Sequence, residues 1–275
     1  MIVNDSASAP GKIILSGEHS VVYGYPALVS AINLRLIVDK SGNINSKIPI
    51  GCGMGSSAAL AVASSALKFA AKSPKLDLEK INDLAYEIEK KQHGYPSGVD
   101  NTISAYGGFL WYRKESESLK LFKSFKPKTE LSNLFIINTG QPKETTGEMV
   151  SFVNFRYRKN RVKVESIFQS IEKLTRSLLE LVINDKNVPI RDLIKENEAL
   201  LEKLNVVSKS TISLIRKIEK FGGSAKICGA GGIKTNSGVL LVFNKDKEKL
   251  YDFINKNGLN VFSVKFGEEG VRIEK

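Results

Sequence analysis

The segment Pro49-Ile50-Gly51-Cys52-Gly53-Met54-Gly55-Ser56-Ser57-Ala58-Ala59-Leu60 carries the clearest structural signal in this chain. Its three glycines alternate with larger residues, and each leaves a backbone amide open to an incoming group. Two serines then begin a long run of small apolar residues, so the pattern predicts a loop that leads into a helix. Unpaired amides and the positive end of the helix dipole meet at such a junction, which suits an anion and above all a polyphosphate.

Two well-known phosphate motifs do not fit this loop. It is not a Walker A motif, because Ser56 stands at the sixth position instead of glycine and no lysine follows. It is not a dinucleotide-binding fingerprint, because the third glycine falls one residue early. A glycine-rich turn with a serine cap explains the same residues, so the loop alone leaves both interpretations open.

Composition limits the class of protein. The 275 residues, 42% hydrophobic and 25% charged, indicate an ordinary globular protein with one large or two smaller domains. No stretch approaches the roughly 18 apolar residues that cross a bilayer, and the N-terminus lacks a basic region followed by an apolar signal segment. We therefore expect a cytoplasmic protein with no membrane contact. The net charge of +12 permits a nucleic-acid role and equally suits phosphate ligands.

Cysteine and histidine are too few for a disulfide framework or a His/Cys metal site, since only Cys52, Cys228, His19 and His93 are present. A hard ion with oxygen ligands remains open. The densest basic cluster, from Arg156 to Lys163, includes aromatic residues and could bind a phosphate backbone. Acidic residues follow it closely, so a solvated helix face explains it better.

Three charged residues lie in unusual surroundings. Lys12 is carried on an apolar run with strand character, Glu89 falls in the last turn of an amphipathic helix, and Asp100 has small and apolar neighbours. The helix dipole disfavours an acid at position 89 unless a cation or a donor compensates. Purely structural roles could explain the other two: Lys12 could lie at the end of a strand, and Asp100 could be an acidic residue at the N-terminus of a helix.

The hydrophobic pattern predicts an α+β chain in two parts, residues 1–146 and residues 147–275. A second glycine cluster, Gly229-Ala230-Gly231-Gly232, lies between two strand-like runs of the second part. We expect helices at 56–71, 77–92, 148–183, 190–221 and 245–256, strands at 29–39, 109–112, 119–122, 134–138, 225–228 and 239–243, and two short strands that close the chain.

Three separated motifs together resemble those of the GHMP kinases, the family of galactokinase, homoserine kinase, mevalonate kinase and phosphomevalonate kinase. They are Pro10-Gly11-Lys12 with Gly17-Glu18-His19, the loop from Gly51 to Ala59, and the cluster from Gly229 to Gly232. The segment from Gly94 to Asn101, which ends in Pro96-Ser97-Gly98-Val99-Asp100-Asn101, resembles the one that holds the catalytic aspartate in mevalonate kinases. The resemblance spans the whole chain, and its specificity lies in the joint occurrence and the order of the motifs.

This resemblance implies a two-domain GHMP kinase fold, with an N-terminal α/β domain like domain 2 of ribosomal protein S5 and a C-terminal ferredoxin-like domain. ATP and its substrate would bind in the cleft between them, and the reaction would be phosphorylation of the primary hydroxyl of mevalonate. Phosphoryl transfer depends on positioning and on charge neutralisation, which agrees with the residues present. The fold would also bring the second and third motifs together, so we expect Cys52 and Cys228 near the nucleotide cleft as reduced thiols.

The resemblance also implies roles for single residues. Asp100 would accept the proton of the attacking hydroxyl, and Lys12 would pair with Asp100 and the γ-phosphate; alternatively, Asp100 only orients the hydroxyl and Lys12 lowers the pKa of that hydroxyl. Mg²⁺ would be held by Glu89 with a hydroxyl of Ser56 or Ser57. The ATP phosphates would be held by the segment of Gly51, Cys52, Gly53, Met54, Gly55, Ser56, Ser57 and Ala58. The expected substrate contacts are Glu18, His19, Ser97, Lys143 and Thr145.

Two other interpretations remain open. A phosphomevalonate kinase would share the ATP site but would need further cations for the substrate phosphate, which the cluster from Arg156 to Lys163 could supply. A nucleic-acid-binding protein would leave no reason for Lys12, Glu89 and Asp100 to occur among glycine motifs. We therefore expect ATP and mevalonate as ligands and no nucleic acid, with a homodimer left open.

Overall fold

The computed structural model describes residues 6–71, 73, 75–93, 96–128, 131–184 and 189–274. Its strands are β1 (Ser6–Ser16), β2 (Ala27–Asp39), β3 (Ile44–Ser46), β4 (Phe109–Lys114), β5 (Lys120–Phe125), β6 (Leu134–Asn138), β7 (Ser224–Ile227), β8 (Val239–Phe243), β9 (Asn260–Phe262) and β10 (Arg272–Glu274). Its helices are the 3-10 turn η1 (Ser20–Tyr23) and α1 (Ser56–Ala70), α2 (Leu78–His93), α3 (Val99–Tyr106), α4 (Thr146–Lys159), α5 (Arg161–Asn184), α6 (Ile190–Lys203), α7 (Lys209–Lys220) and α8 (Lys247–Lys256).

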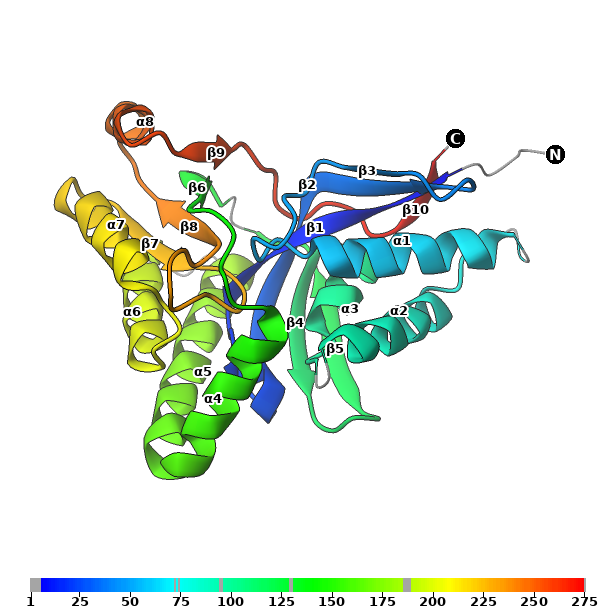
Figure 1. Ribbon diagram of the computed structural model, residues 1–275, viewed down its shortest axis with the longest axis horizontal. Coiled ribbons are helices and arrows are strands. Elements are labelled where there is room, and N and C mark those ends of the chain that lie inside the picture. The colour runs from blue at the N-terminus through cyan, green and yellow to red at the C-terminus, as the bar shows by residue number, and fades with distance from the viewer. Residues whose placement is uncertain are drawn as a thin grey trace.

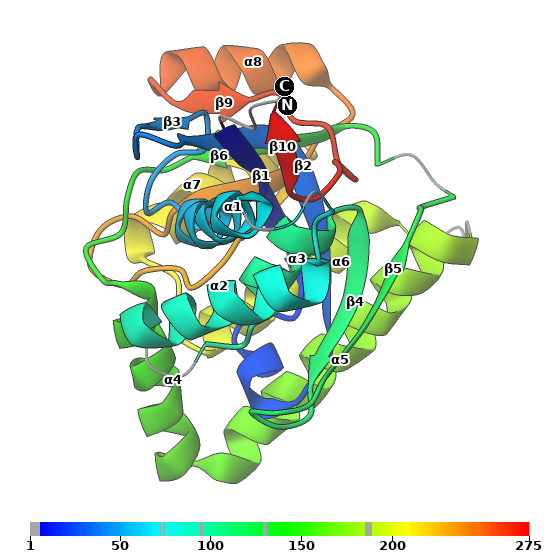
Figure 2. The same cartoon turned by 90° about the vertical axis from the view of Figure 1, so that its right-hand side faces the viewer.

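The strands form two antiparallel sheets with helices around them (Figure 1). The first sheet has the order β10-β1-β2-β4-β5, with β3 paired to β2, and the second has the order β7-β8-β6-β9. Figure 2 shows α1, α2 and α3 gathered into one layer, and α5 running behind the strands. This arrangement confirms the expected α+β class.

Helix α1 lies close to the first sheet because its sequence is rich in alanine. Its buried side chains include Ala59, Val62, Ala63 and Ala66, and it packs on β1 and β2. Small side chains let the helix axis approach the strands, so the glycine loop at the start of α1 is held directly above β1. The predicted helix at 56–71 is therefore confirmed.

The two long helical predictions were wrong in one respect, because each segment forms two helices. Asn160 ends α4 in a non-helical conformation, and its side-chain oxygen accepts a hydrogen bond of 3.1 Å from the Lys163 amide at the start of α5. In the second segment, Asn205 adopts a left-handed φ of 56°, and Ser208 caps α7. Polar side chains that hydrogen-bond the backbone stop a helix even where the hydrophobic period continues.

The division of the sequence at residue 146 does not coincide with the division into two sheets. Strand β6 precedes residue 146 but pairs with β8 and β9, whereas β10 at the end of the described chain returns to pair with β1. Arg35 holds this returning segment, since its guanidinium donates to the Gly270 carbonyl at 2.8 Å and to the Ser8 hydroxyl at 2.8 Å. A domain boundary near residue 146 stays a prediction.

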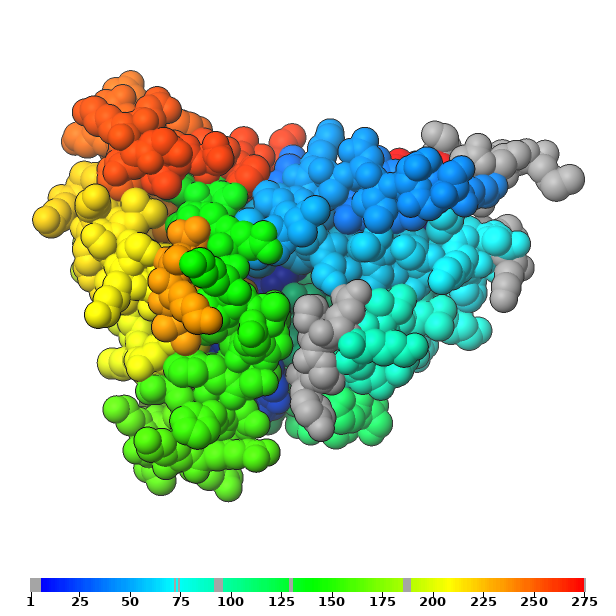
Figure 3. Space-filling model, in the orientation of Figure 1, coloured from blue at the N-terminus to red at the C-terminus, as the bar shows by residue number. Residues whose placement is uncertain are grey.

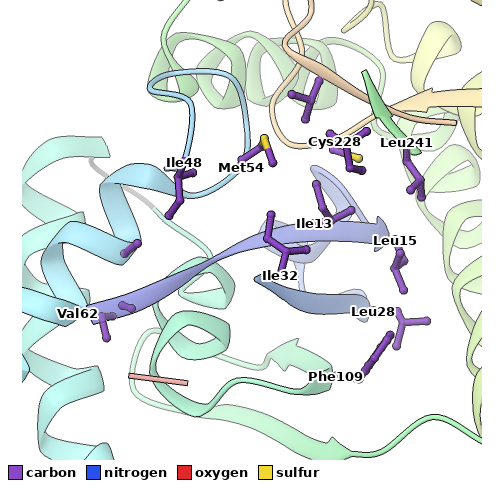
Figure 4. Close-up of a cluster of buried hydrophobic side chains, with 14 of the residues drawn as sticks. Ile13, Leu15, Leu28, Ile32, Ile48, Met54, Val62, Phe109, Cys228 and Leu241 are labelled. Carbon is purple, nitrogen blue, oxygen red and sulfur yellow. The ribbon is translucent and has the colours of Figure 1, made fainter. Parts of the chain in front are cut away.

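One apolar core joins the two halves. Figure 4 shows Ile13 on β1 close to Met54 of the glycine loop and Cys228 after β7, with Leu241 of β8 nearby. Fully burying a side chain of this size stabilises the fold by about 1.5–3 kcal/mol. The loops that carry the motifs are thus anchored by side chains from both sheets. Within the described residues, the helices are too short or too polar to cross a membrane.

Candidate active site

The glycine loop is fastened to β1 where the first motif lies. The Lys12 amide donates to the Met54 carbonyl at 2.9 Å, and a Cβ on Gly11 would stand 2.9 Å from that same oxygen. A Cβ on Gly55 would stand 2.8 Å from Cγ of Lys12. The first two motifs therefore interlock, and glycine is needed where the Lys12 side chain passes the loop.

The alternation of glycines in the loop has a backbone cause. Gly51, Gly53 and Gly55 have φ values of 70°, 88° and 79°, which are left-handed and disfavour other residues. A Cβ on Gly53 would also lie 2.4 Å from the Cys228 carbonyl oxygen, so this glycine lets the second motif touch the third. The expected meeting of the two motifs is confirmed.

The start of α1 is suited to an anion. Gly55 stands at its N-cap position without a capping side chain, and the first turn carries no acidic residue. Cys52 and Met54 are buried, so these two residues offer their backbone rather than their side chains. Ser56 and Ser57 are half-buried at the helix start. The segment 51–58 thus has the geometry of a phosphate site, and binding of ATP there stays a prediction.

Lys12 and Asp100 form an ion pair at the floor of the site. The Lys12 ammonium lies 3.1 Å from an Asp100 carboxylate oxygen, and the side chains are 2% and 27% exposed. Asp100 sits in the first turn of α3, whose N-cap Gly98 has a left-handed φ of 82°. The predicted pairing of the two side chains is confirmed, and it leaves one side of the carboxylate open to a ligand.

Glu89 reaches the same region from the last turns of α2. The side chain is buried, and its Oε2 atom has no hydrogen-bond partner among the described residues. Burial, together with the nearby Asp100 charge, raises the pKa of Glu89 to about 8, although Lys12 opposes this. A buried carboxylate oxygen that lacks a partner and lies near a second carboxylate, Asp100, fits a hard cation such as Mg²⁺.

No group of three or more His, Cys, Asp or Glu side chains in the described part of the chain is arranged to hold a metal ion. An ion at Glu89 would therefore need further oxygen ligands from the serines, from water or from a phosphate, as Mg²⁺ commonly has.

The segment before Asp100 is clamped by residues that the sequence did not single out. The Lys114 ammonium donates to the Pro96 carbonyl at 2.9 Å, and the Tyr112 hydroxyl donates to the Ser97 carbonyl at 2.6 Å. Lys114 lies at the end of β4, 18 residues after Pro96, so its neighbours in the sequence do not indicate this contact. Ser97 itself is half-buried, and its hydroxyl accepts a hydrogen bond from the Val99 amide. Gly94, at the start of the predicted motif, lies outside the described residues.

His19 is held against the third glycine motif. It adopts a left-handed φ of 61°, and Nε2 lies 3.0 Å from the Ala230 carbonyl oxygen. Since a carbonyl only accepts, Nε2 carries the proton and Nδ1 is left as an acceptor. Burial lowers the pKa of His19 to about 4, so the ring is neutral at pH 7. These properties suit a hydrogen bond from a substrate hydroxyl.

Glu18 occupies a different position from the one expected for a substrate contact. Its side chain is completely buried, and its carboxylate is paired with the equally buried Lys226 of β7. A group in this position lies behind the surface of the site. The local sequence could not show this, because the lysine that pairs with Glu18 is distant in the chain.

Lys143 and Thr145 are exposed on the loop between β6 and α4. Thr145 caps α4, because its hydroxyl accepts from the Glu148 amide and its own amide donates to the Glu148 carboxylate. Glu144 accepts hydrogen bonds from the Ile233 and Lys234 amides, so this loop is tied to the segment after the third motif. Figure 3 shows a hollow between this green loop and the cyan segments, with blue N-terminal residues at its floor.

Two further expectations can be placed. Cys52 and Cys228 are both buried, form no disulfide and lie on the two loops that meet at Gly53, as expected. Their closeness to a bound nucleotide and their reduced state stay predictions. The basic cluster from Arg156 to Lys163 spans the junction of α4 and α5, at the end of α4 far from the start of α1 (Figure 1). Arg161 there forms a surface ion pair with Glu165, as expected of a solvated helix face.

Comparison with known proteins agrees with this geometry. A family model described as the GHMP kinases N terminal domain matches residues 27–108. Mevalonate kinase of Archaeoglobus fulgidus is 32% identical, with 98% of this chain and 99% of that protein covered. Mevalonate kinase of Pyrococcus abyssi is 31% identical over 98% and 97%. The crystal structure of Methanococcus jannaschii mevalonate kinase superposes with a TM-score of 0.77 at 23% identity, covering 96% of this chain and 98% of that one.

Proposed function

Because this chain belongs to the GHMP kinase family, among its mevalonate kinases, we propose that it transfers the γ-phosphate of ATP to the primary hydroxyl of mevalonate. The product is 5-phosphomevalonate, an intermediate of isoprenoid biosynthesis. The single observation that carries the proposal is the Lys12–Asp100 ion pair of 3.1 Å beside the glycine loop at the start of α1. A cation, a carboxylate and a phosphate site are thereby brought together.

The loop 51–58 binds the ATP phosphates through backbone amides. Three left-handed glycines turn the backbone around the site, and the uncapped N-terminus of α1 adds the positive end of its dipole. The tight contact between Gly53 and the Cys228 carbonyl supports the loop from the second half of the chain. Few side chains are needed for this binding, since the phosphate groups are recognised by N–H donors.

Asp100 accepts the proton of the attacking hydroxyl, and Lys12 balances the charge that moves onto the transferred phosphoryl group. The Asp100 side chain is 27% exposed and can contact a substrate, whereas the Lys12 side chain is buried and fixed by the loop. A positioned base contributes about 10²- to 10⁴-fold to the rate. In a loose phosphoryl-transfer transition state, positioning and charge balance supply most of the remaining acceleration.

Glu89, with Ser56 or Ser57, would hold the Mg²⁺ ion that accompanies ATP. The unpartnered Oε2 atom of Glu89 is the structural support for this assignment. When bound, the ion would neutralise charge on the nucleotide phosphates. Because the pKa of Glu89 is raised to about 8, binding of the cation would displace a proton near neutral pH.

Mevalonate also presents a tertiary hydroxyl and a carboxylate. Neutral His19 accepts a hydrogen bond from the tertiary hydroxyl through Nδ1, and Lys143 with Thr145 receives the carboxylate at the open edge of the site. Apart from Lys12, the motif segments 10–12, 17–19, 51–59, 96–101 and 229–232 contain no Lys or Arg for a second phosphate, so mevalonate fits better than phosphomevalonate. A cytoplasmic location and a homodimer remain expectations from the sequence.

The test is ATP consumption against a panel of small alcohols in the presence of Mg²⁺. The panel contains mevalonate, phosphomevalonate, homoserine and galactose, so that four activities of the family compete under the same conditions. We expect mevalonate to support turnover, with a product phosphorylated at its primary hydroxyl. Turnover with another alcohol but not with mevalonate would reject the proposal.

A further inference from the structure

Lys226 is a fully buried lysine whose charge is completely satisfied. Its side chain is 0% exposed, and its ammonium donates to the Ile227 carbonyl at 2.8 Å, to the Ile14 carbonyl at 3.2 Å and to the Glu18 carboxylate. Burial is the largest single influence and lowers the pKa of Lys226, but Glu18, with Cys228 and Glu198, raises it above its ordinary value. All three N–H groups of the ammonium therefore have acceptors, one on β1 and one in the turn that follows β1.

Two adjacent residues of the turn after β1 are bonded to β7 and to the loop that follows it. Glu18 is held by Lys226 on β7, and His19 is held by Ala230 in the third glycine motif. Gly17 makes the turn possible, because its φ is 105° and a Cβ there would stand 2.6 Å from the Pro26 carbonyl oxygen. His19 itself has a left-handed φ of 61°, a conformation that needs support from its surroundings.

The segment from Lys226 to Ala230 touches each of the other motifs. Lys226 contacts β1, the Cys228 carbonyl meets the glycine loop at Gly53, and Ala230 accepts from His19. A displacement at Lys226 would therefore change the relative position of the phosphate loop and the turn that carries His19. Misplacement of reacting groups by about 1 Å can lower a rate by about a hundredfold.

We propose that Lys226 is a positioning residue of the active site, which acts through Glu18 to hold the turn Gly17–His19 against the third glycine motif. Glu18 is then a structural partner of Lys226 and does not contact substrate. The kinetic part of this inference rests on the proposed function, whereas the structural part does not.

The test uses two variants, because Lys226→Met alone leaves the Glu18 charge buried without a partner and lowers the urea midpoint of unfolding. The double variant Glu18→Gln with Lys226→Met removes both charges and recovers most of that midpoint, since apolar or neutral replacement of a buried pair is often tolerated. If the pair positions the turn, kcat for mevalonate in the double variant stays at least about tenfold below the parent while the KM changes less.

A second readout does not depend on the substrate. The chain has two histidines, so NMR titration with a His93→Gln variant for assignment follows His19 alone. Release of the turn should move the pKa of His19 from about 4 toward its ordinary value of 6.5. Arg35→Met is the matched control, because it removes another buried cation that ties distant segments. It should lower stability without changing kcat or the His19 titration.

Three results would overturn the inference. The first is a double variant with parental kcat and an unchanged His19 titration, since the pair would then serve stability alone. The second is a rise in KM for mevalonate with kcat unchanged, which would mean that Glu18 contacts the substrate. The third is an unchanged His19 titration in a stable double variant with low kcat. If the parent protein does not phosphorylate mevalonate, the proposed function fails, and the titration still decides whether Lys226 holds the turn.

Discussion

The Lys12 ammonium lies 3.1 Å from an Asp100 carboxylate oxygen, with Lys12 buried under the glycine loop and Asp100 partly open. The cation is fixed by β1 and by the loop, whereas the carboxylate stands at the start of α3. A ligand that reaches Asp100 thus meets a fixed positive charge at the same point.

Asp100→Asn should lower turnover by at least about a hundredfold, because an amide of the same shape cannot accept the hydroxyl proton. ATP binding should survive, since the loop 51–58 does not depend on Asp100. Steady-state kinetics and nucleotide titration measure the two effects separately. The control is Asp246→Asn at the exposed N-cap of α8, where asparagine caps equally well and activity should not change. Near-parental turnover in Asp100→Asn would remove Asp100 from the reaction.

Gly53→Ala should weaken ATP binding, because the new Cβ would stand 2.4 Å from the Cys228 carbonyl oxygen and push the two motifs apart. We expect the KM for ATP to rise at least about tenfold, on the same principle that small displacements at a positioned site have large effects. Gly42→Ala is the matched control, since Gly42 has a similar φ of 86° but nothing within 4 Å of the Cβ. It should lose about 1 kcal/mol of stability and keep its KM for ATP. Equal KM values in the two variants would show that contact with Cys228 does not shape the site.

His19 should make stability depend on pH in the acidic range. Its pKa is about 4 in the folded protein and 6.5 ordinarily, so between these values the unfolded chain binds a proton that the folded chain does not. The free energy of unfolding therefore falls as the pH drops from about 6.5 to about 4. Urea unfolding of the parent and of His19→Gln should give a stability difference about 2 kcal/mol smaller at pH 5 than at pH 7.

Two buried carboxylates give the free energy of unfolding the opposite pH dependence, but they do not affect the difference between parent and variant. Burial is the main cause that raises the pKa of Glu89 and of Glu198 to about 8, so their contribution to stability is lost as the pH rises toward 8. Both residues are present in parent and variant, and their effects cancel in the difference. A difference that is the same at pH 5 and pH 7 would mean that His19 is not held neutral.

The sequence predicted those features that depend on neighbours in the chain. Helix α1 and the strands β6 and β8 were expected within about one residue, because a small-residue run and short apolar runs specify them locally. The glycine loop was recognisable for a similar reason. Gly51, Gly53 and Gly55 have left-handed φ values, and the sequence places glycine at these alternating positions because other residues rarely adopt such values.

Features that depend on distant residues were not predictable from the residues themselves. The Glu18–Lys226 pair, the clamp of Lys114 on Pro96 and the return of β10 to β1 each join segments far apart in the chain. Glu18, next to His19 in the sequence, was expected to contact the substrate because its buried partner Lys226 is distant in the chain. The pairing of Lys12 with Asp100 was expected only because the motifs resemble those of a family.

The measurement that tests the central claim most directly compares kcat/KM for mevalonate and for phosphomevalonate at the same Mg²⁺ and salt concentrations. A phosphomevalonate site must neutralise roughly two more negative charges, and the basic residues from Arg156 to Lys163 lie at the far end of α4 (Figure 1). We predict a clear preference for mevalonate, with phosphomevalonate a poor substrate. A preference for phosphomevalonate would contradict the proposed substrate while leaving the kinase fold and the Lys12–Asp100 pair unchanged.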